Sequence, residues 1–469
     1  MSRASPLLAA TAVLVSLSAA SPAFADEASD LAAIKAQLGA IQREYGSKIR
    51  SLESRLAKAE ADARAARAAA ATASATAGAA QASAAAATVS VDQSTAALQQ
   101  AMADAPPPAP APPASNNAFN PGIAVVLNGF YVASSRDTKN VHIRGIAAGD
   151  AANGTPRGFS LGESEVSLSA NIDPYLIGFL DFSMHDDNSL SVEEAYVQTS
   201  DLPYGITFKA GRFLSGIGYL NERHAHAWSF SDAPLPYRAF LNSQYGDDGV
   251  QVRWLAPTDQ FLEFGAEVFR GDSYPAAGAT HTGQGTVTAF VHTGNDFNDS
   301  ASYLAALSVV HSRAENRDTE GHLFTGTDDL GILSLVYKWA PGGNPTVRNL
   351  LLSSELFYGH EGGVFDGTAF SQNRFGWYVQ GVYQFMPQWS VGLRYAALGT
   401  SNPGHALTGS LLDDFGHAPR SASALLEYDT SEFGRLRMQY THDDADLKPN
   451  DTLLFQYTIV YGPHAAHRY

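Results

Sequence analysis

The chain has 469 residues, no cysteine, only 16% charged residues and a formal net charge of −17 at pH 7. The lack of cysteine excludes disulfide scaffolds, thiol catalysis and cysteine-based zinc sites. No segment after residue 25 holds about 18 consecutive apolar residues, which argues against a protein that crosses a membrane with helices. Such a mixture is typical of a transmembrane β-barrel, whose strands meet lipid on one face and water on the other.

Residues 1–25 have the features of a secretory signal peptide. Arg3 gives a positive start, residues 7–20 form a short apolar run, and residues 23–25 are an Ala-Phe-Ala cleavage motif. The run is too short to span a bilayer as a helix. We therefore expect the mature protein to be exported to the periplasm, the outer membrane or the medium.

Residues 26–72 are predicted to form a periplasmic helix. Apolar residues recur there at steps of three and four, beginning with Leu31, Ile34 and Leu38. This pattern predicts a coiled coil that associates with other copies as a dimer or trimer, because so short a helix is marginal alone. A single amphipathic surface helix is the alternative. Residues 73–118 are rich in Ala, Ser and Pro, and they predict a semi-rigid linker.

Residues 119–469 are predicted to form an all-β domain. Polar and apolar residues alternate with a period of two in residues 164–172, 377–395 and 435–440. Counting such segments predicts an antiparallel transmembrane β-barrel of about 16 strands, and an even number places both of its ends on the periplasmic side. Short turns, expected around residues 174, 203, 257, 387 and 430, alternate with long connections at residues 136–158, 313–327 and 399–417. The last strand leads to Tyr469, a terminal aromatic residue of the kind that barrel-assembly machinery reads.

A polar lumen distinguishes this barrel from a soluble β-sandwich. Arg and Glu recur in mid-strand on the wet face, and aromatic residues gather at strand ends, as a transmembrane barrel requires. The residues expected to line the lumen are Glu163, Glu165, Lys209, Arg253, Glu263, Glu267, Arg394, Arg435 and Arg437.

The longest insertion, residues 215–247, is the third extracellular connection by the strand count. Its aromatic and charged residues indicate a packed loop, and long ordered loops usually have a function. We expect it to fold into the lumen and constrict the pore; an external loop that contacts neighbouring protomers is the alternative. The candidates for the constriction are Tyr219, Glu222, Arg223, Trp228, Asp232 and Arg238.

His224 and His226 lie in the same insertion with one residue between them. In an extended segment this spacing puts both imidazoles on one face, where they could share Zn²⁺ or another divalent cation. Asp247, Asp248 or Glu222 is expected to complete such a site. No other cofactor is expected.

The sequence contains no H-E-x-x-H, G-x-S-x-G or phosphate-loop motif. Glu193 and Glu194 are adjacent, so we expect them to face opposite sides of a strand and not to form an acid/base pair. The protein is therefore not expected to be an enzyme.

The whole net charge falls after residue 118, where 21 Lys and Arg face 38 Asp and Glu. Such a lumen favours cations over anions. The alternative is that acidic loops bind divalent cations among lipopolysaccharides. Nucleic acid is not an expected partner under either interpretation.

Residues 191–199, 208–218 and 246–252 resemble the porin superfamily, in particular the phosphate-selective porin O/P-like group. The resemblance implies a sixteen-stranded channel, a homotrimer in outer-membrane lipid and a coiled coil in the periplasm. Members of that group use basic residues in the lumen. Because this region is acidic, we do not extend phosphate specificity to it.

Residues 119–121, 218–228 and 462–469 are similar to proteins labelled zinc-regulated TonB-dependent outer-membrane receptors. Such receptors need a globular plug and a larger barrel, and the Ala/Pro-rich N-terminal region is not expected to form a plug. The expected function is thus an outer-membrane porin-like channel for passive or weakly selective uptake of small hydrophilic solutes, including cations or metal complexes. A metal receptor and a structural tether that contacts peptidoglycan through the coiled coil are the alternatives.

Overall fold

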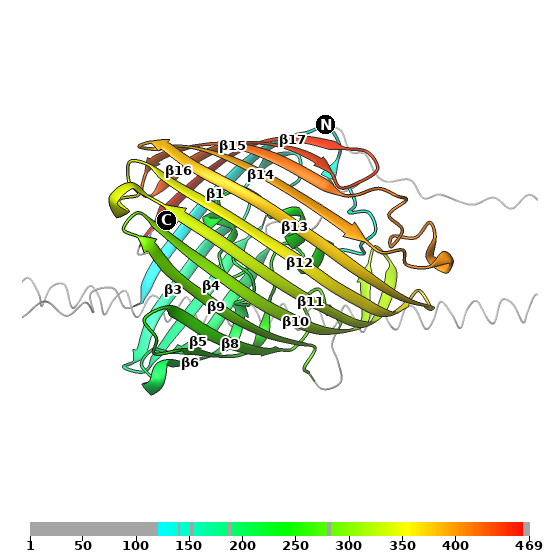
Figure 1. The fold of residues 1–469 in the computed structure, drawn as a ribbon, viewed down its shortest axis with the longest axis horizontal. Coiled ribbons are helices and arrows are strands. Elements are labelled where there is room, and N and C mark those ends of the chain that lie inside the picture. The colour runs from blue at the N-terminus through cyan, green and yellow to red at the C-terminus, as the bar shows by residue number, and fades with distance from the viewer. Residues whose placement is uncertain (1–120, 139–140, 151–153, 186–188, 279–282, 463–469) are drawn as a thin grey trace, which may run out of the picture. The chain divides into compact units, whose positions relative to one another are not determined.

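The computed structural model describes residues 121–138, 141–150, 154–185, 189–278 and 283–462. Within these residues one antiparallel sheet of 17 strands closes into a barrel, because β1 pairs with both β3 and β17 (Figure 1). One of them, β2, has three residues, so sixteen longer strands form the wall of the described barrel. The predicted all-β barrel of about sixteen strands is confirmed. The predicted signal peptide, coiled coil and linker lie outside the described residues, as does the chain end from residue 463.

Strands make up most of the described part of the chain. In chain order they are β1 Gly122–Ser134, β2 Gly158–Ser160, β3 Ser164–Asp173, β4 Leu176–Met184, β5 Leu190–Thr199, β6 Ile206–Leu214, β7 Gly246–Leu255, β8 Phe261–Phe269, β9 Thr286–Asn298, β10 Ala301–Thr319, β11 His322–Trp339, β12 Asn349–Phe365, β13 Thr368–Met386, β14 Trp389–Thr400, β15 Arg420–Ser431, β16 Gly434–Asp444 and β17 Asn450–Tyr461. The strands β10 to β13 are the longest, with 17 to 19 residues each. No helix in the described part of the chain is long and apolar enough to cross a membrane.

The two ends of the barrel differ in the length of their connections. At one end of the barrel, called the turn end, short turns join neighbouring strands. The first residue of β1 and the last residue of β17 both lie at this end. The loop end carries the long connections. They are L1 (residues 135–163, which include β2), L3 (residues 215–245), L4 (residues 270–285) and L7 (residues 401–419). This alternation is the one predicted from the sequence, with one exception.

The exception is the predicted loop at residues 313–327. The structure extends β10 and β11 through this segment and joins them at Glu320 and Gly321, whose φ angles of 56° and 86° are typical of a tight hairpin turn. The prediction was wrong because charged residues here indicated a loop. In the structure Arg317 pairs with Glu361 on β12 at 2.6 Å, and both side chains are buried, so these two charges belong to the inner face.

Side chains alternate between the two faces of the wall, as predicted. On β16, Leu436 and Met438 are exposed on the outer face, whereas Arg437 and Gln439 are buried on the inner face. Aromatic residues pair on the outer face near the turn end, and Trp389 lies 4.8 Å from Tyr428 between ring centroids. The barrel is therefore apolar outside and polar inside.

The main hydrophobic core lies inside the barrel and is built around the helix α2, Leu235–Leu241, of L3. All seven helical residues are buried, and Tyr237 packs edge to face against Phe357 of β12. A helix this short is not stable alone, so its packing against the wall maintains it. It ends at Asn242, which takes the left-handed conformation with φ of 50° that Asn tolerates at a helix end.

The turn between β12 and β13 offers a test of the hairpin geometry. Gly367 there has φ of 78°, and a side chain added to it meets no atom within 4 Å. Gly367→Val should therefore destabilise the barrel by about 1–2 kcal/mol through backbone strain alone. The urea midpoint of the refolded protein measures the loss. Gly399→Val is the control, because a side chain added at Gly399 also meets no atom within 4 Å but Gly399 lacks a positive φ. Equal losses of stability in both variants would contradict backbone strain at Gly367 as the cause.

Candidate functional site

L3 passes through the inside of the barrel and reaches the wall opposite its own strands. Its residue Asp232 lies 2.5 Å from the guanidinium of Arg394 on β14. The carbonyl oxygen of Trp228 accepts a hydrogen bond of 2.6 Å from Arg437 on β16. Because these partners belong to the inner face, the middle of L3 lies in the lumen.

Two buried carboxylates of the wall hold the start of L3. Glu267 on β8 accepts hydrogen bonds from the hydroxyl of Ser215 and, at 2.9 Å, from the backbone N–H of Gly216. Glu355 on β12 accepts a hydrogen bond of 2.8 Å from the backbone N–H of Tyr219. Charge-assisted bonds of this kind are roughly twice as strong as neutral ones. Glu267 is among the predicted lumen residues, whereas sequence reasoning missed Glu355.

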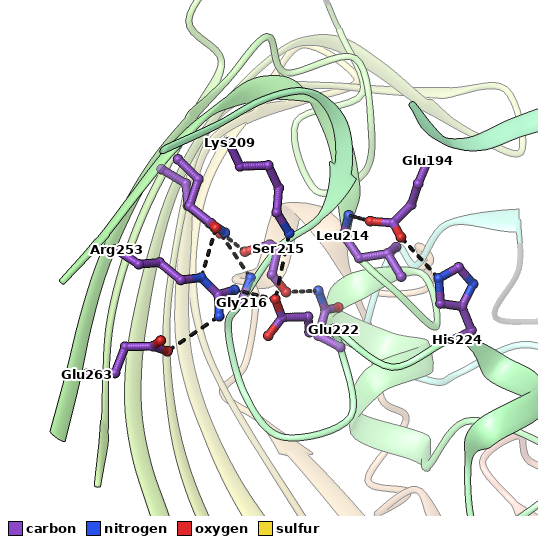
Figure 2. Close-up of polar contacts among 12 residues, drawn as sticks. Glu194, Lys209, Leu214, Ser215, Gly216, Glu222, His224, Arg253 and Glu263 are labelled. Atoms are coloured by element: carbon purple, nitrogen blue, oxygen red, sulfur yellow. Dashed lines mark hydrogen bonds and ion pairs between the residues drawn. The ribbon is translucent and has the colours of Figure 1, made fainter. Parts of the chain in front are cut away.

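A group of alternating charges lies beside this attachment. Figure 2 shows Arg253 of β7 between Glu222 of L3 and Glu263 of β8. Its guanidinium lies 3.4 Å from Glu263, and the ammonium of Lys209 on β6 lies 3.9 Å from Glu222. Lys209, Arg253 and Glu263 are all predicted lumen residues, and the structure brings them together around one residue of the loop.

The basic wall, defined as Arg394, Arg435 and Arg437, lies on β14 and β16. Arg437 forms an ion pair with Glu427 of β15, and Arg435 lies 3.6 Å from the same carboxylate. Arg435 also donates a hydrogen bond to the carbonyl oxygen of His226 in L3. The basic wall therefore binds backbone carbonyls of the loop as well as its acidic side chains.

The inner face also carries the histidine cluster, which consists of Glu165 of β3, Glu193 and Glu194 of β5, and His224 and His226 of L3. The ring of His226 is hydrogen-bonded to Glu165 at 2.8 Å, and both side chains are almost fully buried. The ring of His224 lies 3.0 Å from Glu194 through Nε2, and Figure 2 shows the two side chains facing each other. Its Nδ1 lies 3.4 Å from Glu165 and 3.5 Å from Glu193. One imidazole is thus surrounded by three carboxylates.

The positions of Glu193 and Glu194 correct a prediction. Adjacent strand residues were expected on opposite faces, but the pairing of β4 with β5 shifts register between Asp181 and Phe182. Asp181 pairs with Glu194 and Phe182 with Val192, which leaves Glu193 as the extra residue of a β-bulge. The bulge turns both carboxylates toward the histidine. A single sequence carries no clear signal for such a bulge.

The carboxylates expected beside the histidines lie elsewhere. Asp247 accepts hydrogen bonds of 2.8 Å from the backbone N–H groups of Gly271 and Asp272 in L4. Asp248 pairs with Arg212 at 2.8 Å, and Glu222 pairs with the Arg253 group described above. The carboxylates that do reach the histidines come from β3 and β5, which are far from L3 in the sequence.

Burial disfavours the charged form of His224, but the three surrounding carboxylates, Glu165, Glu193 and Glu194, outweigh it and raise the pKa of His224 well above its usual value. Its contacts with the three carboxylates link L3 to β3 and β5.

Cavities lie on both sides of L3. One of about 630 Å³ lies toward the loop end and is lined by Glu163, Asp232 and residues of β16 and β17. One of about 520 Å³ lies toward the turn end and is lined by Arg223, Arg435 and Arg437. Trp228 lines both cavities, so its indole stands between them.

The remaining constriction candidates, Arg223 and Arg238, also lie in L3. Arg223 lies over the ring of Tyr219 at 4.4 Å and faces the cavity at the turn end. Arg238 on α2 forms a buried ion pair of 2.6 Å with Asp443 of β16. Arg223 therefore faces the cavity, whereas Arg238 attaches the loop to β16.

No family model matches the sequence. A protein of Aquifex aeolicus (strain VF5), named "Uncharacterized protein", is 28% identical over 391 residues, which cover 76% of this chain and 81% of that protein. The trimer form of OmpT, an outer membrane protein of Vibrio cholerae, is a structural neighbour with a TM-score of 0.46, 11% identity and coverage of 72% and 98% of the two chains. The anion-selective porin from Comamonas acidovorans has a TM-score of 0.46, 10% identity and coverage of 72% and 98%. At these values the likenesses carry no argument about function.

Proposed function

We propose that the protein is an outer-membrane channel through which small hydrophilic solutes diffuse. The observation that carries the proposal is a closed barrel of sixteen long strands with L3 inside it and a cavity on each side of Trp228. Barrels of 16 to 18 strands leave an aqueous channel, whereas receptors with a plugged lumen have about 22 strands. The strand number therefore favours a porin over the TonB-dependent receptor.

The outer surface supports a position in a bilayer. Large apolar side chains are exposed on it along several strands, with Leu393 of β14 70% and Leu335 of β11 54% exposed. A soluble protein would not leave such an apolar belt in water. The first residue of β1 and the last residue of β17 both lie at the turn end, which in barrels of this kind is the periplasmic side. The N-terminal region is accordingly proposed to lie in the periplasm.

The electrostatics of the lumen support weak selectivity. L3 contacts acidic groups of β3 and β5 through its histidines, and it contacts guanidinium groups of β14 and β16 through Asp232 and backbone carbonyl oxygens. Charges of both signs therefore lie beside the loop. The barrel region as a whole has 38 acidic and 21 basic residues. We propose a modest preference for cations on this ground. Lipopolysaccharide contact, a homotrimer and peptidoglycan contact through the coiled coil belong to the same proposal.

Planar-bilayer recording of the full-length refolded protein tests the function. We expect discrete conductance steps and, under a salt gradient, a reversal potential that indicates a preference for cations. Protein that is folded by circular dichroism but gives no steps would contradict the channel. Steps with a firm preference for anions would contradict the selectivity alone.

A further inference from the structure

The histidine cluster has the donor atoms of a metal site. We propose that Glu165, His224 and His226 bind one Zn²⁺ ion, with Glu193 or a water at the fourth position. Such an ion would fasten the first half of L3 to the wall of β3 and β5. Zinc binding is a property separate from the channel function, because it can be measured whether or not the barrel conducts.

The three residues offer suitable ligands at suitable positions. Each provides one ligand atom, and these atoms lie within 4.8 Å of one another. Imidazole nitrogen and carboxylate oxygen are common zinc ligands. The two rings are brought together by the 3₁₀ turn Ala225–Ala227, which begins directly after His224 and includes His226, with ring centroids 5.6 Å apart.

Two atoms of the cluster point to an ion directly. Glu165 Oε2 and His224 Nδ1 are buried, and neither has a hydrogen-bond partner in the described part of the chain. They lie 3.4 Å apart, and Glu193 Oε2 lies 3.5 Å from the same nitrogen. In a tetrahedral zinc site with bonds of about 2.0–2.2 Å, neighbouring ligand atoms are about 3.3–3.6 Å apart. These two separations therefore match two edges of such a tetrahedron, and an ion would satisfy both atoms.

The surroundings of His224 also fit a zinc ligand. Its other ring nitrogen, Nε2, lies 3.0 Å from Glu194 Oε2. Histidines that bind zinc almost always donate their second ring N–H to a carboxylate or carbonyl, which orients the ring and strengthens the bond to the metal. Glu194 would be this orienting residue. Glu165, Glu193 and His226 would lie on the other side of the ring, next to the ion.

The local charge favours a divalent cation. Asp181 is buried beside the cluster, its Oδ1 has no hydrogen-bond partner among the described residues, and it forms a second close group with Glu165 and Glu193. Within residues that the structure describes, Glu165, Glu193 and Glu194 make ion pairs only with the two histidines, and Asp181 makes none. Buried charges need paired partners, and one divalent ion would balance this excess.

An ion can reach the site from the loop end. Glu163 and Ala225, which flank the cluster in the sequence, line the cavity of about 630 Å³ on that side of L3. The ligands come from a strand end and from the loop, so an occupied site joins two parts of the chain that are far apart in the sequence.

Zinc titration of the full-length, untagged protein in detergent tests the proposal. The protein is stripped of metal, and a chromophoric chelator competes for Zn²⁺. We expect one tightly bound ion per chain, and Glu165→Gln or His226→Ala should weaken binding by at least roughly 100-fold. Co²⁺ in place of Zn²⁺ should give the visible absorption of a tetrahedral site, and the same variants should lose it.

His292→Ala is the matched control, because His292 faces inward and its ring lies 3.1 Å from the carbonyl oxygen of Gly216 in L3, away from the cluster. A second control, His464→Ala with His467→Ala, removes the terminal histidines. Both controls should bind as the unmodified protein does. Folded protein without bound zinc, or cluster variants that bind normally, would overturn the site. Conductance without zinc binding overturns only this inference; zinc binding without conductance overturns only the channel.

Discussion

Trp228→Ala should raise the conductance of a single channel roughly two-fold, because the indole stands between the two cavities and pore cross-section limits conduction. The backbone of the variant keeps its attachment, since the bond from Arg437 goes to the carbonyl oxygen of residue 228. In the unmodified protein the indole N–H donates a hydrogen bond of 2.7 Å to the carbonyl oxygen of Arg223. In the variant this oxygen faces a cavity that water can enter, so water replaces the lost donor. Planar-bilayer recording measures the change.

Trp389→Ala is the control for this prediction. Trp389 lies on the outer face of β14 against Tyr428, so its removal changes the surface and leaves the lumen intact. We expect its single-channel conductance to equal that of the unmodified protein. An unchanged conductance in the Trp228 variant would show that solutes pass elsewhere or that L3 rearranges to fill the space.

The wall of the barrel was predictable because its signal is local. Alternation in β16, where Arg437 and Gln439 face in and Leu436 and Met438 face out, follows from the period of a strand and needs no knowledge of the partner strand. The predicted lumen residues that lie in strands, Arg437 among them, are on the inner face for the same reason, whereas Glu163 precedes β3. What each one contacts was not predictable.

Features that depend on register or closure escaped prediction. The bulge at Glu193 depends on how β5 pairs with β4, and one extra residue reverses the face of its neighbours. Glu355 contacts Tyr219, which is 136 residues away, only because the barrel closes around L3. The charged tips of β10 and β11 indicated a loop because the pairing of Arg317 with Glu361 is equally remote. The histidine pair was visible in the sequence, but its acidic partners were not.

Glu355→Leu should destabilise the protein by on the order of 4 kcal/mol, because it leaves several buried donors without an acceptor. The carboxylate accepts hydrogen bonds from the backbone N–H of Tyr219 and from the hydroxyls of Ser334 and Tyr378, at 2.8, 2.5 and 2.6 Å. Removing a buried charge offsets part of this loss, but three orphaned donors outweigh it. The urea midpoint of the refolded protein measures the effect.

Amide hydrogen exchange in the Glu355→Leu variant distinguishes a local effect on L3 from a general loss of barrel stability. Because Tyr219 belongs to L3, amides of residues 217–222 should exchange faster, while those of β16 should lose less protection. Ser353→Ala is the control: Ser353 is buried on the same face of β12, its hydroxyl has no hydrogen-bond partner in the described part of the chain, and its loss should cost less than about 0.5 kcal/mol. Equal effects in the two variants would mean that Glu355 does not hold the loop. Faster exchange in L3 with a more variable single-channel current would instead tie the position of the loop to the width of the pore.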